Sequence, residues 1–203
     1  MERGKFITLE GLDGAGKTTH IGWLTDELRM CGKTVRITRE PGGTALGEKL
    51  RGILLHERMH PDTEALLMFA ARQEHLREVI IPALEGGEWV VCDRFTDATM
   101  AYQGGGRGIP VAKLAILERW VQGDLQPDLT LYFDVPVPVA LARLRGTHAE
   151  DRFEREQAAF FERVRAAYLD RVAGAPGRIR LIKGDEPMER VKAELETIVR
   201  TLC

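Results

Sequence analysis

The segment Gly11-Leu12-Asp13-Gly14-Ala15-Gly16-Lys17-Thr18 decides how the chain folds, because it matches the pattern G-x-x-x-x-G-K-[ST] of phosphate-binding loops. Its glycines let the backbone turn sharply and bring N–H groups against an anion. Lys17 supplies a cation for the β- and γ-phosphate oxygens, and the Thr18 hydroxyl is suited to Mg²⁺. The segment therefore predicts a binding site for a nucleoside triphosphate.

The residues on either side of this segment support the interpretation. Residues 5–10 are typical of a short buried strand, and residues 19–28 place Ile21, Leu24 and Leu28 at helical spacing. A strand, a glycine loop and a helix in this order put phosphate at a helix N-terminus, where unpaired amides and the helix dipole favour anions. The alternative is a glycine-rich turn with a chance Lys-Thr, and the flanking pattern disfavours it.

Composition and charge exclude several other classes of protein. The chain has 203 residues, of which 44% are hydrophobic and 30% charged, which suits one α/β domain with a full core. A net charge of −2 provides no basic footprint for nucleic acid or an anionic membrane. No run approaches the roughly 18 apolar residues of a membrane span. Cys31, Cys92 and Cys203 are odd in number and lack metal-type spacing, so we expect reduced thiols and a cytoplasmic location.

Strand and helix patterns alternate along the rest of the chain. Further strands are expected at residues 34–38, 89–92, 129–135 and 178–182. Helices are expected at residues 46–55, 62–83, 111–121, 138–144, 154–173 and 186–202. This alternation predicts a parallel sheet that is covered by helices on both faces. The glycine-rich run 104–108 is expected to be mobile.

Charged residues follow two of the predicted strands, at the edge where open α/β sheets bind ligands. Arg39 and Glu40 open a Pro-Gly-Gly turn, and Asp93 and Arg94 come directly after the third strand. A carboxylate next to a guanidinium suits Mg²⁺ or phosphate, although a charged solvated turn is the alternative at Arg39 and Glu40. Arg72 interrupts an apolar part of the long helix, and a cation near a buried face needs a partner.

An arginine-rich segment lies between the fourth and fifth predicted strands. Arg143, Arg145 and Arg152 occur there close together. Such stretches are usually solvated surface, but in phosphoryl transferases arginines on a movable segment can close over the phosphates. We therefore expect a lid at about residues 143–154, within a single domain of residues 1–203.

Four segments together are similar to one family: residues 10–19 (Glu-Gly-Leu-Asp-Gly-Ala-Gly-Lys-Thr-Thr), 38–44 (Thr-Arg-Glu-Pro-Gly-Gly-Thr), 93–95 (Asp-Arg-Phe) and 101–108 (Ala-Tyr-Gln-Gly-Gly-Gly-Arg-Gly). The first segment is shared by many kinases, whereas the second combined with the fourth is nearly diagnostic. On these segments the chain resembles the bacterial thymidylate (dTMP) kinases along essentially its whole length. The resemblance implies a P-loop kinase fold with a five-stranded parallel sheet, a lid over ATP, and a homodimer.

The resemblance also implies roles for individual residues. ATP would contact the phosphate loop and one lid arginine: Gly11, Leu12, Asp13, Gly14, Ala15, Gly16, Lys17, Thr18, Thr19 and Arg143. Mg²⁺ would be held by Thr18 and Asp93. For dTMP, Asp13 would lie near the 3′-hydroxyl, and Arg51 and Arg94 would hold the phosphate. Arg72 would hydrogen-bond the thymine, and Tyr102 would pack on the sugar. Three further residues would lie close to the bound nucleotide: Glu40, Thr99 and Gln103. Catalysis would rest on Lys17, Asp93, Arg94 and Arg152.

The chain departs from the family's pattern at three positions. The family usually has a stacking phenylalanine four residues before the thymine arginine, but here that residue is Met68, with Phe69 next to it. Either Phe69 reaches the base from a shifted angle, or Met68 covers it with a polarizable thioether. Ala98 replaces a common serine, so one hydroxyl contact is absent unless Thr99 supplies it. Gly14 replaces an arginine found in some members, which implies that the lid supplies the catalytic arginine.

The implied reaction is ATP + dTMP → ADP + dTDP by in-line transfer. A phosphate monoester has a second pKa of about 6, so the acceptor is already ionised at neutral pH and no general base is required. The nearest alternative is another nucleotide or deoxynucleoside kinase on the same scaffold. A switch GTPase is disfavoured, because the guanine-reading Asn-Lys-x-Asp is absent from the sequence. An enzyme that only hydrolyses ATP is a third alternative.

Overall fold

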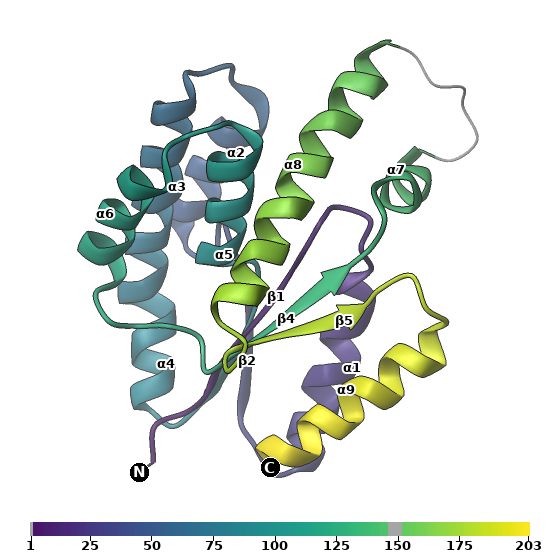
Figure 1. Cartoon of the computed structure of the whole chain (residues 1–203). Coiled ribbons are helices and arrows are strands. Elements are labelled where there is room, and N and C mark those ends of the chain that lie inside the picture. Colours follow the sequence, from purple (N-terminus) through teal and green to yellow (C-terminus); the bar gives the residue numbers. More distant parts are fainter. Residues whose placement is uncertain (1, 146–151) are drawn as a thin grey trace.

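The structure, a computed structural model, has a five-stranded parallel sheet at its centre (Figure 1). It describes residues 2–145 and 152–203, with side chains at 2–144 and 157–203. The strands lie in the order β2-β3-β1-β4-β5. Their bounds are β1 (Phe6–Gly11), β2 (Val35–Arg39), β3 (Trp89–Asp93), β4 (Leu129–Asp134) and β5 (Ile179–Lys183).

Helices connect these strands and cover both faces of the sheet. Within the described residues they are α1 (Lys17–Met30), α2 (Ala45–His56), α3 (Pro61–His75), α4 (Ile81–Glu85), α5 (Thr96–Thr99), α6 (Val111–Gln122), α7 (Val137–Arg145), α8 (Arg152–Gly174) and α9 (Met188–Leu202). Two π-helical segments accompany them, η1 (Leu76–Ile80) and η2 (Met100–Gly106). Helices α1 and α9 lie together on one face, and α4, α5 and α8 lie on the other (Figure 1).

The central strand β1 explains where the phosphate loop lies. All six of its residues are buried, as expected for a parallel strand covered on both faces. Ile7 and Leu9 belong to the same core cluster as Leu24 and Leu28 of α1. On the other face, Phe6 packs edge-on against Phe95, with ring centroids 4.9 Å apart. The loop after β1 therefore opens at the carboxyl edge of the sheet, between the ends of β3 and β4.

The predicted α/β fold with a five-stranded parallel sheet is confirmed. The single helix predicted at 62–83 is broken into three parts, because η1 inserts a wider π-helical turn between α3 and α4. None of the helices in residues 2–145 and 152–203 combines the length and apolar character that crossing a membrane requires.

The prediction that residues 104–108 form a mobile run is wrong. Gly104 to Gly106 lie in η2, which packs against α8. A Cβ on Gly105 would lie 2.5 Å from the Cβ of Ala167, and one on Gly106 would lie 2.5 Å from the ring of Phe160. The glycines are therefore required because two helical segments approach each other closely.

A buried ion cluster holds α5 in place beside this contact. The Asp97 carboxylate is 2% exposed and accepts hydrogen bonds from Arg171 of α8 at 2.8 Å and from Arg178 at 2.6 Å. Arg178 also donates to Thr130 of β4 at 2.8 Å. These charge-assisted bonds fix α5, and with it the segment that follows Arg94, against α8 and β4.

Candidate active site

A cavity of about 630 Å³ lies over the carboxyl ends of the strands. Most of the residues predicted for the site line it: Asp13, Gly14, Gly16, Lys17, Thr18, Thr19, Glu40, Arg51, Met68, Asp93, Arg94 and Tyr102. A small recess shares some of this lining and adds Arg72 and Thr99. Sequence positions from 13 to 102 are thus brought together at one edge of the sheet, as expected for an open α/β fold.

The phosphate loop forms one end of the cavity. Gly14 and Gly16 have φ values of 80° and 92°, which favour glycine, and a Cβ on Gly14 would lie 2.5 Å from the carbonyl oxygen of Ala140. Helix α1 starts at Lys17, and its N-cap residue Gly16 has no side chain to occupy the first amides. The helix N-terminus therefore offers its N–H groups to an anion. Of the other loop residues, Leu12 and Ala15 are buried in the core.

Lys17 is folded into this loop. Its side chain is 6% exposed, and Nζ donates to the carbonyl oxygens of Gly11 at 3.2 Å and Leu12 at 3.1 Å. Burial, and then the nearby charge of Arg94, lower the pKa of Lys17 to about 8. A phosphate placed beside Nζ would favour the charged form and raise this pKa again.

Arg94 is held in an uncommon backbone conformation. Its φ is 68°, and its N–H donates to the carbonyl oxygen of Leu9 at 2.9 Å. The guanidinium lies 4.8 Å over the Tyr102 ring and donates to the hydroxyls of Tyr102 at 3.1 Å and Tyr168 at 3.2 Å. It also pairs with Asp13 at 2.8 Å. Such strain is found where the surrounding structure over-determines a functional side chain.

Glu10 lies beneath Arg94 and is fully buried. Its carboxylate accepts the N–H of Phe95 at 2.7 Å and the hydroxyl of Tyr168 at 2.9 Å. Burial, and then the charge of Asp97, raise the pKa of Glu10 to about 8. For Asp13, burial acts in the same direction, but Arg94 and then Lys17 outweigh it and lower the pKa of that carboxyl. The protonated form is thus favoured for Glu10 and the charged form for Asp13, although both carboxyls lie close to Arg94.

The predicted metal ligands fit a magnesium ion. Asp93 and Thr18 both line the cavity, and Asp93 Oδ1 is buried without a hydrogen-bond partner in the described part of the chain. The described residues contain no cluster of three or more His, Cys, Asp or Glu side chains that could hold a metal alone. Magnesium in kinases is bound by one or two protein oxygens together with substrate phosphates, so this sparse donor set is suitable.

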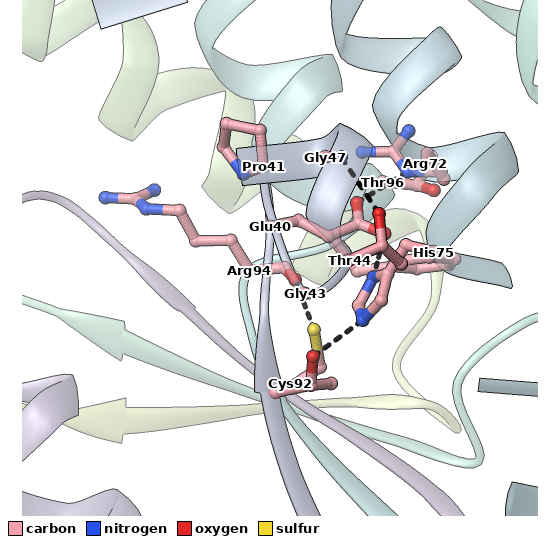
Figure 2. Close-up of polar contacts among 12 residues, drawn as sticks. Glu40, Pro41, Gly43, Thr44, Gly47, Arg72, His75, Cys92, Arg94 and Thr96 are labelled. Carbon is pink, nitrogen blue, oxygen red and sulfur yellow. Dashed lines mark hydrogen bonds and ion pairs between the residues drawn. The ribbon is translucent and has the colours of Figure 1, made fainter. Parts of the chain in front are cut away.

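Arg72 forms the opposite end of the site (Figure 2). It is 2% exposed, and its guanidinium lies between the rings of Phe69 and Phe95, 4.8 Å and 4.9 Å from their centroids. Nε donates to Glu40 at 2.8 Å, and Nη2 donates to Thr99 at 2.8 Å. Nη1 is buried and has no partner among the described residues. A guanidinium nitrogen can only donate, so this end of the site is suited to a ligand that brings an acceptor.

The structure separates the two alternatives for the missing stacking residue. Met68 lines both the cavity and the recess. Phe69 lines neither, since it is 2% exposed and packs with Ala65 and Met100 in the core. Its ring supports the guanidinium of Arg72 from behind, so the prediction of Phe69 as a ligand contact is not supported by its position.

Three further predicted residues lie at the margins of the site. Gln103 is 3% exposed, donates to Glu64 at 2.8 Å, and leaves its Oε1 without a partner within the described residues. Arg51 donates to the carbonyl oxygen of Pro41 at 2.9 Å. Arg143 donates to the carbonyl oxygens of Gly14 at 3.2 Å and Gly184 at 3.0 Å. The side chain of Arg152 lies outside the described residues.

Sequence reasoning missed several residues of the cavity wall and of the layer beneath it. Leu54, Leu55, Glu64 and Arg107 line the cavity, and Glu64 pairs with Arg107 at 3.2 Å. The sequence did point to Arg107 as a site residue, because it ends the Tyr-Gln-Gly-Gly-Gly-Arg segment on which the family resemblance rests. Glu10, His75 and Tyr168 are buried behind the wall. Glu10 ends an apolar stretch, which was a signal, whereas His75 follows three polar residues and its burial had no signal in the sequence.

Comparisons with known proteins identify one family. A family model described as thymidylate kinase matches residues 9–195. The thymidylate kinase of Bordetella pertussis is 62% identical over 200 residues, which cover 98% of this chain and 96% of that protein. The thymidylate kinase of Cupriavidus necator is 60% identical over 202 residues, which cover 98% of this chain and 100% of that protein.

A solved structure extends the likeness to the fold. The crystal structure of thymidylate kinase from Ehrlichia chaffeensis matches with a TM-score of 0.79 and 34% identity, and the match covers 99% of each chain. The chain belongs to the thymidylate kinase family.

Proposed function

We propose that this cavity transfers the γ-phosphoryl group of ATP to dTMP, giving ADP and dTDP. Family membership supports the reaction. The observation that carries the assignment is the asymmetry of the cavity. A phosphate loop with Lys17 forms one end, and the buried, unpartnered Nη1 of Arg72 lies at the other. ATP brings its phosphates to the loop, and dTMP, bound between the loop and Arg72, brings a thymine carbonyl to Arg72 as the acceptor.

The acceptor nucleotide is bound along the wall between the two ends. Arg72 donates to a thymine carbonyl, and Met68 covers the base. Tyr102, whose hydroxyl accepts from Arg94, lies along the sugar, and Asp13 lies near the 3′-hydroxyl. Arg94 and Arg51 both line the cavity and hold the monophosphate. Glu40, Thr99 and Gln103 act through the contacts that they make with Arg72 and Glu64.

Transfer proceeds in line, without a general base, because the monophosphate is ionised at neutral pH. The protein contributes position and positive charge, which stabilise the charge that spreads over the transferred group. Lys17 and Arg94 supply this charge. Thr18 and Asp93 would hold Mg²⁺, which would supply further positive charge to the phosphate groups. Asp93 is therefore a metal ligand in this scheme and accepts no proton.

The lid proposal has one described arginine to support it. We propose that residues 143–154 form the lid of a single domain, residues 1–203. Arg143 places a guanidinium at the Gly14 carbonyl, a position where the loop residue itself has no side chain. Arg152 as the catalytic lid arginine remains a prediction, because its side chain and residues 146–151 lie outside the described part of the chain.

We also propose a homodimer that forms through the outer face of α3 and α6. Leu66, Ile116 and Trp120 expose 54%, 69% and 80% of their surfaces there. They border two apolar hollows between these helices. A patch of this kind marks an interaction surface, and a second copy of the chain brings a matching patch by two-fold symmetry. Sedimentation equilibrium at micromolar concentration is expected to show a dimer, and a monomer would contradict the proposal.

A cytoplasmic location is proposed for the same protein. Cys31, Cys92 and Cys203 are all free thiols in the structure, which is usual in a reducing compartment. Cell fractionation of the source organism, followed by blotting, tests this location.

The test of the proposed function is ADP formation measured against a panel of acceptors. We expect rapid turnover with dTMP, slow turnover with dUMP, and little with dCMP, AMP or thymidine. The dUMP expectation follows because one methyl group in an apolar pocket discriminates by only about 1–3 kcal/mol. A faster reaction with another acceptor would identify a different nucleotide kinase, and phosphate release without any acceptor would identify a hydrolase.

A further inference from the structure

A chain of buried side chains extends behind Arg72, away from the cavity (Figure 2). Arg72 donates from Nε to Oε2 of Glu40 at 2.8 Å. The other oxygen of that carboxylate, Oε1, lies 3.0 Å from Nδ1 of His75. Nε2 of the same imidazole lies 2.6 Å from the hydroxyl of Thr38. His75 is fully buried, and neither the proposed reaction nor the proposed ligand contacts use it.

The direction of these hydrogen bonds follows from their partners. Nδ1 of His75 faces a carboxylate oxygen, which only accepts, so Nδ1 carries the proton and donates. Nε2 faces the hydroxyl of Thr38, which can donate to it. Each oxygen of Glu40 therefore has one donor, from Arg72 on one side and from His75 on the other. Two opposed donors fix the rotation of the carboxylate, whereas one donor would leave it free to turn.

The imidazole ring itself is fixed by the turn that follows β2. A Cβ on Gly43 would lie 2.5 Å from both Cδ2 and Nε2 of His75, so the ring lies directly against the backbone of that glycine. Gly43 has a φ of 82°, which favours glycine. The N–H of Glu40 in the same turn donates to the carbonyl oxygen of Asp93 at 2.9 Å. The backbone of Glu40 and the ring of His75 are thus both anchored, and only the Glu40 side chain remains to be held.

Two independent anchors hold Arg72 in turn. One is Glu40, and the other is the Thr99 hydroxyl, which accepts from Nη2 at 2.8 Å. The rings of Phe69 and Phe95 keep the guanidinium plane in place. With Nε and Nη2 both occupied, Nη1 is the one nitrogen of this guanidinium without a partner in the described chain. Its orientation depends on the Glu40 contact, and hence on His75.

We infer that His75 is a positioning residue for base selection: by donating to Glu40 it keeps Arg72 oriented so that Nη1 donates only to a base with a carbonyl group at that place. The inference rests on the proposed binding of dTMP in this cavity. Thymine brings an oxygen to a donor-only nitrogen, whereas cytosine brings an amino group, which is also a donor. A buried donor left facing another donor discriminates strongly, because neither group is paired. Loosening Arg72 is expected to weaken this discrimination.

Two substitutions separate the two bonds that His75 makes. The amide nitrogen of Asn in His75→Asn can occupy the place of Nδ1 and donate to Glu40. The longer side chain of His75→Gln reaches the place of Nε2 and Thr38, and it leaves Glu40 with one donor. Both variants replace the buried imidazole ring by a smaller amide side chain, so each is the control for the other.

The experiment measures kcat/KM for dTMP and for dCMP with wild type and both variants. We expect His75→Gln to lower the dTMP-to-dCMP ratio about tenfold, mainly through a higher KM for dTMP with kcat little changed, since the net contribution of one hydrogen bond, here that from His75 to Glu40, corresponds to a factor of this order. His75→Asn is expected to keep most of the wild-type ratio. Melting temperatures of all three proteins accompany the kinetics.

Defined outcomes would overturn the inference. A purely structural role for His75 would impair both substrates equally in both variants, or would follow the melting temperature, and the ratio would not change. If His75→Gln does not fold, Thr38→Val replaces it, because it removes the partner of Nε2 at constant volume. This variant should lower the ratio by a smaller factor, and an unchanged ratio overturns the inference. A wild-type enzyme that fails to phosphorylate dTMP would instead contradict the proposed function.

Discussion

The two ends of the cavity are built in different ways. The phosphate end is one continuous segment, residues 11–19, which presents the N–H groups at the start of α1 and one lysine, Lys17, at the cavity. The base end is a set of side chains from β2, α3 and α5, joined by hydrogen bonds that leave a single guanidinium nitrogen of Arg72 unpaired. Donors are abundant at the first end and almost used up at the second. The first end is therefore suited to phosphate groups whatever base they carry, and the second is suited to selecting among bases.

This difference leads to distinct expectations for substitutions. A change at the phosphate end should lower turnover by the same factor for every acceptor nucleotide. A change at the base or sugar end should alter the ratio between acceptors. Substitutions at the lid, at Lys17 and at Tyr102 test whether the two ends can be separated in this way.

The largest expected effect is at the lid. Arg152→Ala should lower kcat by about 10³–10⁵, as loss of an arginine that stabilises the transferred phosphoryl group does in other phosphoryl transferases. Binding of dTMP, measured by calorimetry, should change much less. Arg143→Ala and Arg145→Ala are the matched controls. Normal kcat in all three variants would contradict the proposal that the lid supplies the catalytic charge.

Lys17→Ala should have the next largest effect. Loss of one preorganised donor to developing charge lowers kcat by about 10²–10³, and we expect the same factor with dTMP and dUMP because Lys17 does not reach the base. Lys49→Ala, an exposed lysine on α2, is the control and should keep full activity. Steady-state kinetics with both acceptors provide the measurement. A factor that differs strongly between dTMP and dUMP would show that the two ends are coupled.

Tyr102 lies between the ends and should affect sugar choice. Its ring contacts Arg94 and packs edge-on against Tyr168, with centroids 6.4 Å apart, so it cannot move aside easily for a 2′-hydroxyl. Tyr102→Ala should therefore raise the ratio of kcat/KM for ribothymidine monophosphate over dTMP by an amount worth about 1–3 kcal/mol. Tyr102→Phe keeps the ring and should leave the ratio unchanged. Equal losses with both nucleotides would mean that Tyr102 only packs.

The smallest effect on turnover is expected at Glu10, whose contribution is to stability. Its pKa is raised to about 8 in the folded chain from an ordinary value of 4.5, so the folded state binds more protons than the unfolded state between these values. The stability that this carboxyl contributes is therefore fully present below about pH 4.5, and this contribution is lost as the pH rises through about 8. Glu10→Gln should flatten this slope in thermal melts between pH 5 and pH 9. An identical slope in both proteins would contradict the raised pKa.

The sequence predicted the phosphate end better than the base end, for a physical reason. The properties of residues 11–19 are local, because glycines and a helix start determine the loop whatever surrounds it, and Lys17 and Thr18 line the cavity as expected. The base end depends on which helix face meets which strand. Arg72 could be identified as a cation in need of a partner, but nothing in the order of residues showed that the partner would be Glu40 and that His75 would stand behind it.

Predictions from the local sequence pattern were weakest where packing against a neighbouring element decides how a residue is used. Glycine runs are common in mobile loops, so residues 104–108 were expected to move, and the run instead forms part of η2. Phe69 was a candidate for the base because of its ring, but the twist of α3 turns it into the core and turns Met68 toward the cavity. In both cases a neighbouring element, which the local sequence does not reveal, decides the environment of the residue.

The close contact between η2 and α8 also has an evolutionary consequence. Gly105 and Gly106 tolerate no side chain while Ala167 and Phe160 occupy their present places. A change in either segment therefore requires a compensating change in the other, and the two should vary together among descendants of this sequence. The segment that carries Tyr102 and helix α8 are therefore expected to change in step.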